Sequence, residues 1–293
     1  MILHTALVLF LVMTFSRCGL PDGSSSPTNN IDEMTPDEAR KILSKTHRGY
    51  GEVPFLLYMR EGNTRMVKLQ LKAGMDPNTI DKHRLLYSGT RNDPVLMYAV
   101  SSSKSEIAMA LIEAGADVTI TGRNGMTPLM YAVIRDNPEL VKALIKAGAD
   151  VNGRVGANMT VLVYAVLGGR VDSDDAFIGL LMNAVTGLSA ELHGTGSSRR
   201  GNLSTQDLAL KDSPECVRLL LEAGADVDAQ TAHGETALMY AAHTGRIKKA
   251  RLLLEYGADP TLTNLQGETA LRMAKKRDRT EMMQLLREYG VEK

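Results

Sequence analysis

The sequence ALIKAGADVN occupies residues 143–152, and variants of the same ten residues recur along the chain. The copies are LQLKAGMDPN at 69–78, ALIEAGADVT at 110–119, LLLEAGADVD at 219–228 and LLLEYGADPT at 252–261. Two pairs of consecutive copies lie 33 residues apart. A fixed period of this length is the signature of a repeat architecture. We therefore expect most of the chain to be built from one structural unit.

A second glycine stands 23 residues before the glycine of several copies: Gly125 before Gly148, Gly234 before Gly257, and Gly267 before Gly290, which ends a truncated last copy, LLREYG at 285–290. There, GMTPLMYAV begins at Gly125, GETALMYAA at Gly234 and GETALRMA at Gly267. Thr127 can cap a helix, and a proline after it fits the first helical turn. Gly148 is typical of a helix end in the left-handed conformation. Each unit is thus predicted to be two helices that must stack on neighbouring units to bury their apolar faces.

This pattern resembles the ankyrin repeat family over about residues 50–293. The resemblance implies an all-α solenoid of stacked helix–turn–helix units with short β-hairpin loops. Where a copy has its glycine, we take the residue 23 positions before it as the anchor of one repeat. Counting the anchors predicts about seven repeats, with insertions near residues 79–91 and 186–200. The anchors are Gly51, Asn92, Gly125, Asn158, Gly201, Gly234 and Gly267. The fourth repeat is degenerate, and its second helix is expected at residues 176–185.

A short capping segment is predicted before the repeats, at residues 35–49. Thr35 and Glu38 have the spacing of a capping box, and Pro36 stands at the first helical position. We expect a helix over residues 36–46.

The N-terminus resembles a targeting segment. Residues 5–15 form an apolar run that is too short to span a bilayer, which needs about 20 residues, and fits a signal peptide over residues 1–17. Cys18 follows in a context similar to a bacterial lipobox, so we expect its lipidation, with residues 18–34 as a flexible tether. Free secretion or periplasmic release, an uncleaved start, and a buried N-terminal element are the alternatives.

The composition argues against several classes of protein. Lys and Arg together number 34, as do Asp and Glu, so the net charge is zero and a nucleic-acid binder is not expected. The chain has no Trp and two cysteines, Cys18 and Cys216. Cys216 lies in an apolar run and is predicted to be a buried, inert thiol.

No motif in the sequence indicates catalysis, and we predict no catalytic, cofactor-binding or metal-binding residues. The six histidines form no HExxH pair, and no phosphate loop or GxSxG elbow is present. One enzymatic alternative is a divalent cation bound within residues 168–200 by Asp172, Asp174 and Asp175. Acidic residues at a helix start are ordinary, which favours the non-enzymatic interpretation.

Tyrosines recur at one position of the first helices, where the ankyrin pattern has packing residues. We therefore expect them in the core, with a binding stripe as the alternative. They are Tyr98, Tyr131, Tyr164 and Tyr240.

The resemblance also implies where a protein partner binds, because the family uses hairpin tips and the inner face of the first helices. The matching positions are Arg91, Asp93, Arg123, Asn124, Met126, Ile134, Arg135, Arg199, Arg200, Asn202, His233, Glu235, His243 and Gln266. Met126 and Ile134 are expected to be exposed apolar contacts. His233 and His243 are expected either to approach each other or to be separately solvated.

The first insertion adds Arg84 and Tyr87 to the expected contacts, beside Leu85 and Leu86. Its leucines either form part of a docking finger or fold back on the array.

The sequence thus predicts a monomeric, non-catalytic protein-interaction module without cofactors, exported to the cell envelope. It is expected to be periplasmic or anchored to the membrane only through a lipid at Cys18. The alternative is a secreted effector directed at a host protein.

Overall fold

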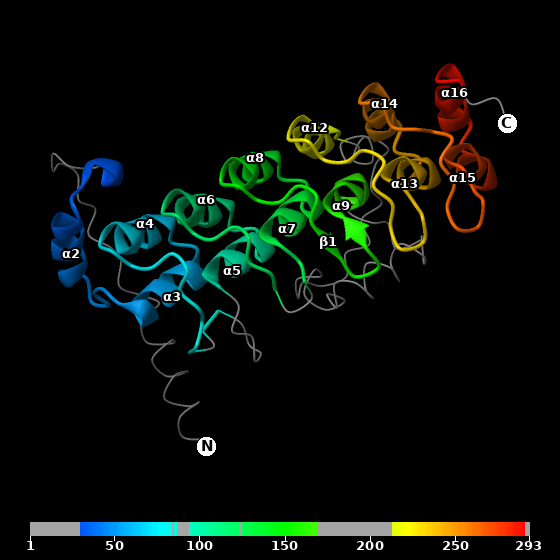
Figure 1. Cartoon of the computed structure of the whole chain (residues 1–293). Coiled ribbons are helices and arrows are strands. Elements are labelled where there is room, and N and C mark those ends of the chain that lie inside the picture. Colours follow the sequence, from blue (N-terminus) through cyan, green and yellow to red (C-terminus); the bar gives the residue numbers. More distant parts are fainter. Residues whose placement is uncertain (1–29, 84, 87–93, 123–124, 169–212, 291–293) are drawn as a thin grey trace, which may run out of the picture. The chain divides into compact units, whose positions relative to one another are not determined.

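The computed structural model describes residues 30–83, 85–86, 94–122, 125–168 and 213–290, and it confirms the all-α repeat fold (Figure 1). Its elements are the 3-10 helix η1 (Ile31–Glu33), α2 (Pro36–Ser44), α3 (Glu52–Glu61), α4 (Thr64–Lys72), α5 (Val95–Ser101), α6 (Ser105–Glu113), α7 (Pro128–Ile134), α8 (Pro138–Lys146), β1 (Arg154–Val155), β2 (Met159–Thr160), α9 (Val161–Leu167), α12 (Glu215–Glu222), α13 (Ala237–Thr244), α14 (Ile247–Glu255), α15 (Ala270–Lys276) and α16 (Thr280–Glu288).

The repeat helices form two rows (Figure 1). The first-helix row consists of α5, α7, α9, α13 and α15, each in contact with the next. The second-helix row consists of α4, α6, α8, α12, α14 and α16, also in sequential contact. Contacts between the rows pair α5 with α6, α7 with α8, α9 with α12, α13 with α14, and α15 with α16, and α3 pairs with α4 before them.

The described residues therefore contain six helix pairs, and the predicted division of residues 158–228 into two repeats is wrong. Helix α9 contacts α7 on one side and α13 on the other, so no repeat stands between α9 and α13. The pair α9 and α12 is a single repeat. Residues 135–137 separate α7 from α8, whereas residues 168–214 separate α9 from α12. The 23-residue spacing between Gly201 and Gly224 is therefore coincidental.

Caps define where the helices begin and end. The hydroxyl oxygen of Thr127 accepts a hydrogen bond from the amide of Met130 at 3.2 Å, and Thr160, Thr236 and Thr269 cap their helices in the same way. Such caps satisfy amides that have no partner inside the helix. Gly148 ends its repeat with a φ of 92°, as predicted.

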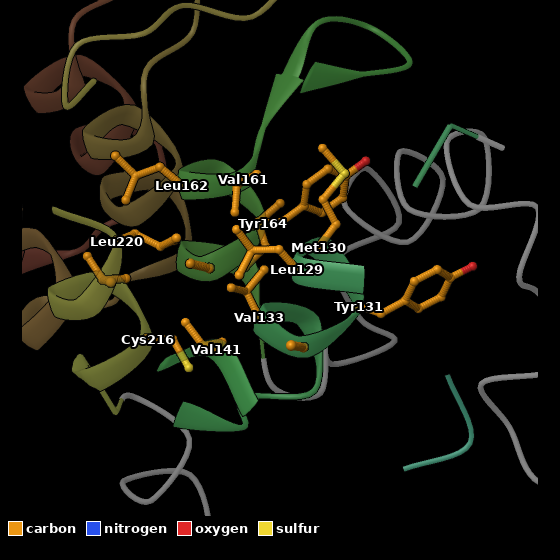
Figure 2. Close-up of a cluster of buried hydrophobic side chains, with 14 of the residues drawn as sticks. Leu129, Met130, Tyr131, Val133, Val141, Val161, Leu162, Tyr164, Cys216 and Leu220 are labelled. Atoms are coloured by element: carbon orange, nitrogen blue, oxygen red, sulfur yellow. The ribbon is translucent and has the colours of Figure 1, made fainter. Parts of the chain in front are cut away.

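The apolar core runs between the two rows. Figure 2 shows Cys216 and Leu220 of α12 together with Val141 of α8 and Val161 of α9. Cys216 is buried, as predicted, and burial raises the pKa of its thiol, with Asp136 adding to the effect. The thiol is therefore held in its neutral form, which is the inert state.

The capping segment also matches its prediction. Thr35 and Glu38 form the expected capping box, and α2 ends at Ser44, two residues before the predicted end. Arg40 donates to the carbonyl of Ala73 at 2.9 Å, which fixes α2 beside α4. The buried amide of Gln70 donates to the carbonyl of Gly49 at 2.8 Å.

Two predicted loop regions contain ordered structure. The predicted tether 18–34 includes the 3-10 turn η1, which Asn30 caps. In the first insertion, the buried carboxylate of Asp81 accepts from the amides of Leu85 and Leu86 at 3.0 and 2.7 Å. Leu86 is buried and Leu85 packs against the core, so the leucines fold back on the array.

Among the described residues, no helix has both the length and the apolar character needed to cross a membrane.

Candidate protein-binding surface

Hydrogen bonds join the hairpins of the last three repeats into one surface. The amide of Ala232 donates to the carbonyl of Ala157 at 2.9 Å, and the amide of Leu265 donates to the carbonyl of His233 at 3.0 Å. Arg154 adds a side-chain bond to the carbonyl of Gln230 at 3.0 Å. Successive hairpin tips are therefore fixed relative to one another and offer a preorganised surface.

The exposed side chains on these hairpin tips include His233, Leu265 and Gln266. His233 and Gln266 are exposed, as their assignment to a binding surface requires. Leu265, beside Gln266, is 74% exposed, the most exposed of the large apolar residues in the described part of the chain.

The predicted exposure of Met126 is wrong, because this side chain is fully buried in the core. Met126 directly precedes the helix cap Thr127, and its backbone carbonyl accepts from Gly122, which turns the side chain under the hairpin. Met159 occupies the equivalent position and is buried as well. Ile134 is half-buried against the core rather than exposed.

Glu235 occupies the same position as Met126 and is also buried, with 8% exposure. Its carboxylate accepts a hydrogen bond of 2.6 Å from the hydroxyl of Tyr240. Burial and this bond raise the pKa of Tyr240, which keeps the phenol in its donating form. Glu235 therefore has a structural partner within its own repeat.

The four recurring tyrosines are buried, so their assignment to the core is confirmed. Their hydroxyl groups are not equivalent. Tyr240 donates to Glu235, whereas the hydroxyl of Tyr164 is buried and has no hydrogen-bond partner among the described residues.

These two environments predict opposite effects for the same mutation. Tyr240→Phe should lower the free energy of unfolding by about 2 kcal/mol, because it leaves a buried carboxylate without its donor. Tyr164→Phe should raise it by about 1 kcal/mol, because it removes a buried hydroxyl that lacks a partner. Urea unfolding of both variants measures the effects, and changes of the same sign would contradict this interpretation.

His243 and Arg135 each contact a neighbouring repeat. The imidazole of His243 lies 2.9 Å from the guanidinium of Arg277 and lines a shallow depression with Met239 and Met273. Arg135 donates to the carbonyl of Ser101. His243 is half-buried beside α15, whereas His233 is exposed on its hairpin.

Several predicted contacts lie outside the described residues. They are Arg84, Tyr87, Arg91, Asp93, Arg123, Asn124, Arg199, Arg200 and Asn202, together with the lipidation candidate Cys18 and the acidic residues Asp172, Asp174 and Asp175. Within the described ranges, no cluster of three or more His, Cys, Asp or Glu residues could hold a metal ion.

A family model for ankyrin repeats in three copies matches residues 55–155, 96–186 and 206–293. The chain belongs to the ankyrin repeat family. The crystal structure of EF0377, an ankyrin repeat protein, matches with a TM-score of 0.60 and 23% identity, over 82% of this chain and 100% of that chain. This likeness shows a shared fold. No curated protein matches the chain.

Two residues of this ankyrin array were missed by sequence reasoning. Leu265 stands at a hairpin tip, and a leucine at such a position in the sequence already indicates an exposed apolar side chain. Lys249 replaces an apolar residue of the second helices, such as Leu140, and is fully buried. Its ammonium group donates to the carbonyls of Ala165, Val166 and Gly168 at 2.9, 3.2 and 3.3 Å.

Lys249 donates to carbonyls at the end of α9 whose equivalents in another repeat accept from backbone amides. In the third repeat, the carbonyls of Ala132 and Val133 accept from the amides of Asn137 and Asp136 in the short turn. The equivalent carbonyls in the fourth repeat belong to Ala165 and Val166, and both accept from Lys249. A positive charge is favourable there because it faces the carbonyl end of a helix.

Proposed function

We propose that this ankyrin array docks a partner protein through the hairpin tips of its last three repeats and the adjacent face of α13 and α15. Ankyrin repeats indicate a protein–protein interaction module in general. The proposed contact residues among the described ones are His233, Leu265, Gln266 and His243.

The exposure of Leu265 is the observation that carries this proposal. Its backbone amide is fixed to His233 at 3.0 Å, yet 74% of the residue is open to solvent. An apolar side chain held on a rigid backbone loses little entropy on binding and buries apolar surface in the complex. His233 and Gln266 supply a polar rim beside it.

We further propose that the array works in the cell envelope, either anchored through Cys18 or released. The apolar run at residues 5–15 and the position of Cys18 support this location. Intact mass of the protein recovered from membrane and soluble fractions tests it. A mass that includes the leader in every fraction would overturn the proposal.

Affinity capture with the full chain as bait tests the docking surface. We expect the variant Leu265→Asp to reduce the recovery of a specific partner at least tenfold, because a charge would be buried at the contact. Tyr256→Asp is the matched control, since Tyr256 is an exposed apolar residue at the end of α14. Circular dichroism should show that both variants are folded.

The comparison between the two variants decides the outcome. Equal loss of capture in both would indicate a general effect of the added charge rather than a contact at the hairpin tip. Unchanged capture by Leu265→Asp would place the binding surface elsewhere on the array.

A further inference from the structure

A cavity of about 430 Å³ lies beside the turns that join α5 to α6 and α7 to α8, in the second and third repeats. These turns follow the C-terminal ends of α5 and α7, whereas the hairpins lie at the N-terminal ends of these helices. Its described lining includes Val100, Ser105, Ala132, Arg135 and Leu140. This volume falls in the range that proteins use for small organic ligands. Among the described residues, none from the hairpin tips or from the proposed docking surface lines this cavity.

Arg135 supplies an unused donor to this cavity. One terminal nitrogen of its guanidinium donates to the carbonyl of Ser101, but the Nε group is buried and has no hydrogen-bond partner within the described residues. Burial lowers the pKa of Arg135, because desolvation disfavours its charged form. An unsatisfied, buried guanidinium nitrogen is costly, and an anionic acceptor would remove that cost.

Two further features favour an anion at the same place. The nine-residue helices α6 and α8 both begin at this cavity, and helix N-termini attract negative charge. Ser105 begins α6, and its hydroxyl oxygen accepts from the side-chain amide nitrogen of Asn137 at 2.7 Å. The hydroxyl proton of Ser105 is therefore available to donate to a ligand.

The other residues that line the cavity indicate the chemical character of the rest of the ligand. Val100, Ala132 and Leu140 are buried apolar residues and form an apolar wall. Asp136 also lines the cavity, but it interacts with the thiol of Cys216 in α12. The cavity thus offers one cation, hydroxyl donors, apolar surface and one carboxylate that is engaged with the thiol of Cys216.

We propose that this cavity binds a small carboxylate with an apolar body, whose oxygens face Arg135 and Ser105 and whose carbon chain packs on Val100 and Leu140. The carboxylate comes from a free metabolite-sized molecule rather than from an acidic side chain of a protein.

Calorimetric titration of the full chain with hexanoate tests this proposal. We expect saturable binding at one site, and at least tenfold weaker binding of hexanamide, which has the same length without the charge. Arg135→Gln should weaken hexanoate binding at least tenfold, and Ser105→Ala about threefold. Arg251→Gln is the control, because Arg251 is an exposed base on α14, away from the cavity, and should leave the affinity unchanged.

Two further titrations distinguish a free carboxylate from the other possible sources of a bound anion. Inorganic phosphate and a hexaglutamate peptide are titrated in parallel with hexanoate. Failure of hexanoate to saturate would overturn the proposal, whether or not the peptide binds. Tighter binding of phosphate than of hexanoate would also overturn it, because the apolar wall would then contribute nothing. Equal hexanoate affinity in the parent and in folded Arg135→Gln and Ser105→Ala variants would place the ligand elsewhere.

Discussion

Replacing Lys249 with alanine should lower the free energy of unfolding by about 3 kcal/mol. The mutation leaves three carbonyls of α9 and its end without their donor and creates a cavity where a long side chain was fully buried. Urea unfolding followed by circular dichroism measures the loss. A change below about 1 kcal/mol would contradict the assigned role.

Lys249→Leu is the matched control, because leucine or a similar apolar residue stands at this position in other repeats, as at Leu140 and Ile107. Leucine restores most of the packing but not the hydrogen bonds. Removing a buried charge relieves its desolvation, yet the carbonyls lose their bonds to the ammonium group. We therefore expect a smaller loss of about 1–2 kcal/mol. If leucine were as stable as lysine, packing alone would explain the alanine result.

Deleting residues 169–211 should leave a folded protein that is more stable by about 2 kcal/mol, because a shorter connection between α9 and α12 costs less chain entropy to close. The joined sequence LGDSPE would match IRDNPE at residues 134–139. It also restores the 23-residue spacing between Asn158 and Gly224 that Gly125 and Gly148 have. Thermal and urea unfolding measure the difference.

This deletion tests the assignment of six repeats directly. If the removed segment contributed a helix pair to the stack, its loss would separate α9 from its neighbours and destabilise the array. The restored turn also supplies backbone amides to the end of α9. The penalty of Lys249→Leu should therefore be smaller in the shortened chain than in the full one, which a double-mutant cycle measures.

The sequence was sufficient to predict the family, the helix caps and the buried faces, because these depend on spacing within one repeat. Thr127, Gly148 and Cys216 all behave as predicted. The number of repeats was not predictable in the same way. A chance glycine at 201 matched the expected spacing, and only the contact between α9 and α13 shows that a single repeat lies there.

The candidate binding surface was predicted in part. Hairpin positions such as His233 and Gln266 are exposed, but the position before each helix cap is not, as Met126 and Glu235 show. Sequence spacing places these residues on the hairpin without stating which way the side chain turns. Leu265 was visible in the sequence, but its exposure depends on where the hairpin of the last repeat lies.

The sequence by itself determined the repeating unit of this protein, since each ankyrin repeat encodes its caps, turn glycine and apolar stripe locally. The tertiary structure decided which helices pair, which way side chains turn, and how Lys249 completes the end of α9 from another repeat. The physical reason is that these features depend on contacts between repeats. Such contacts join residues more than 80 positions apart, as for Lys249 and Ala165, and no local pattern records them.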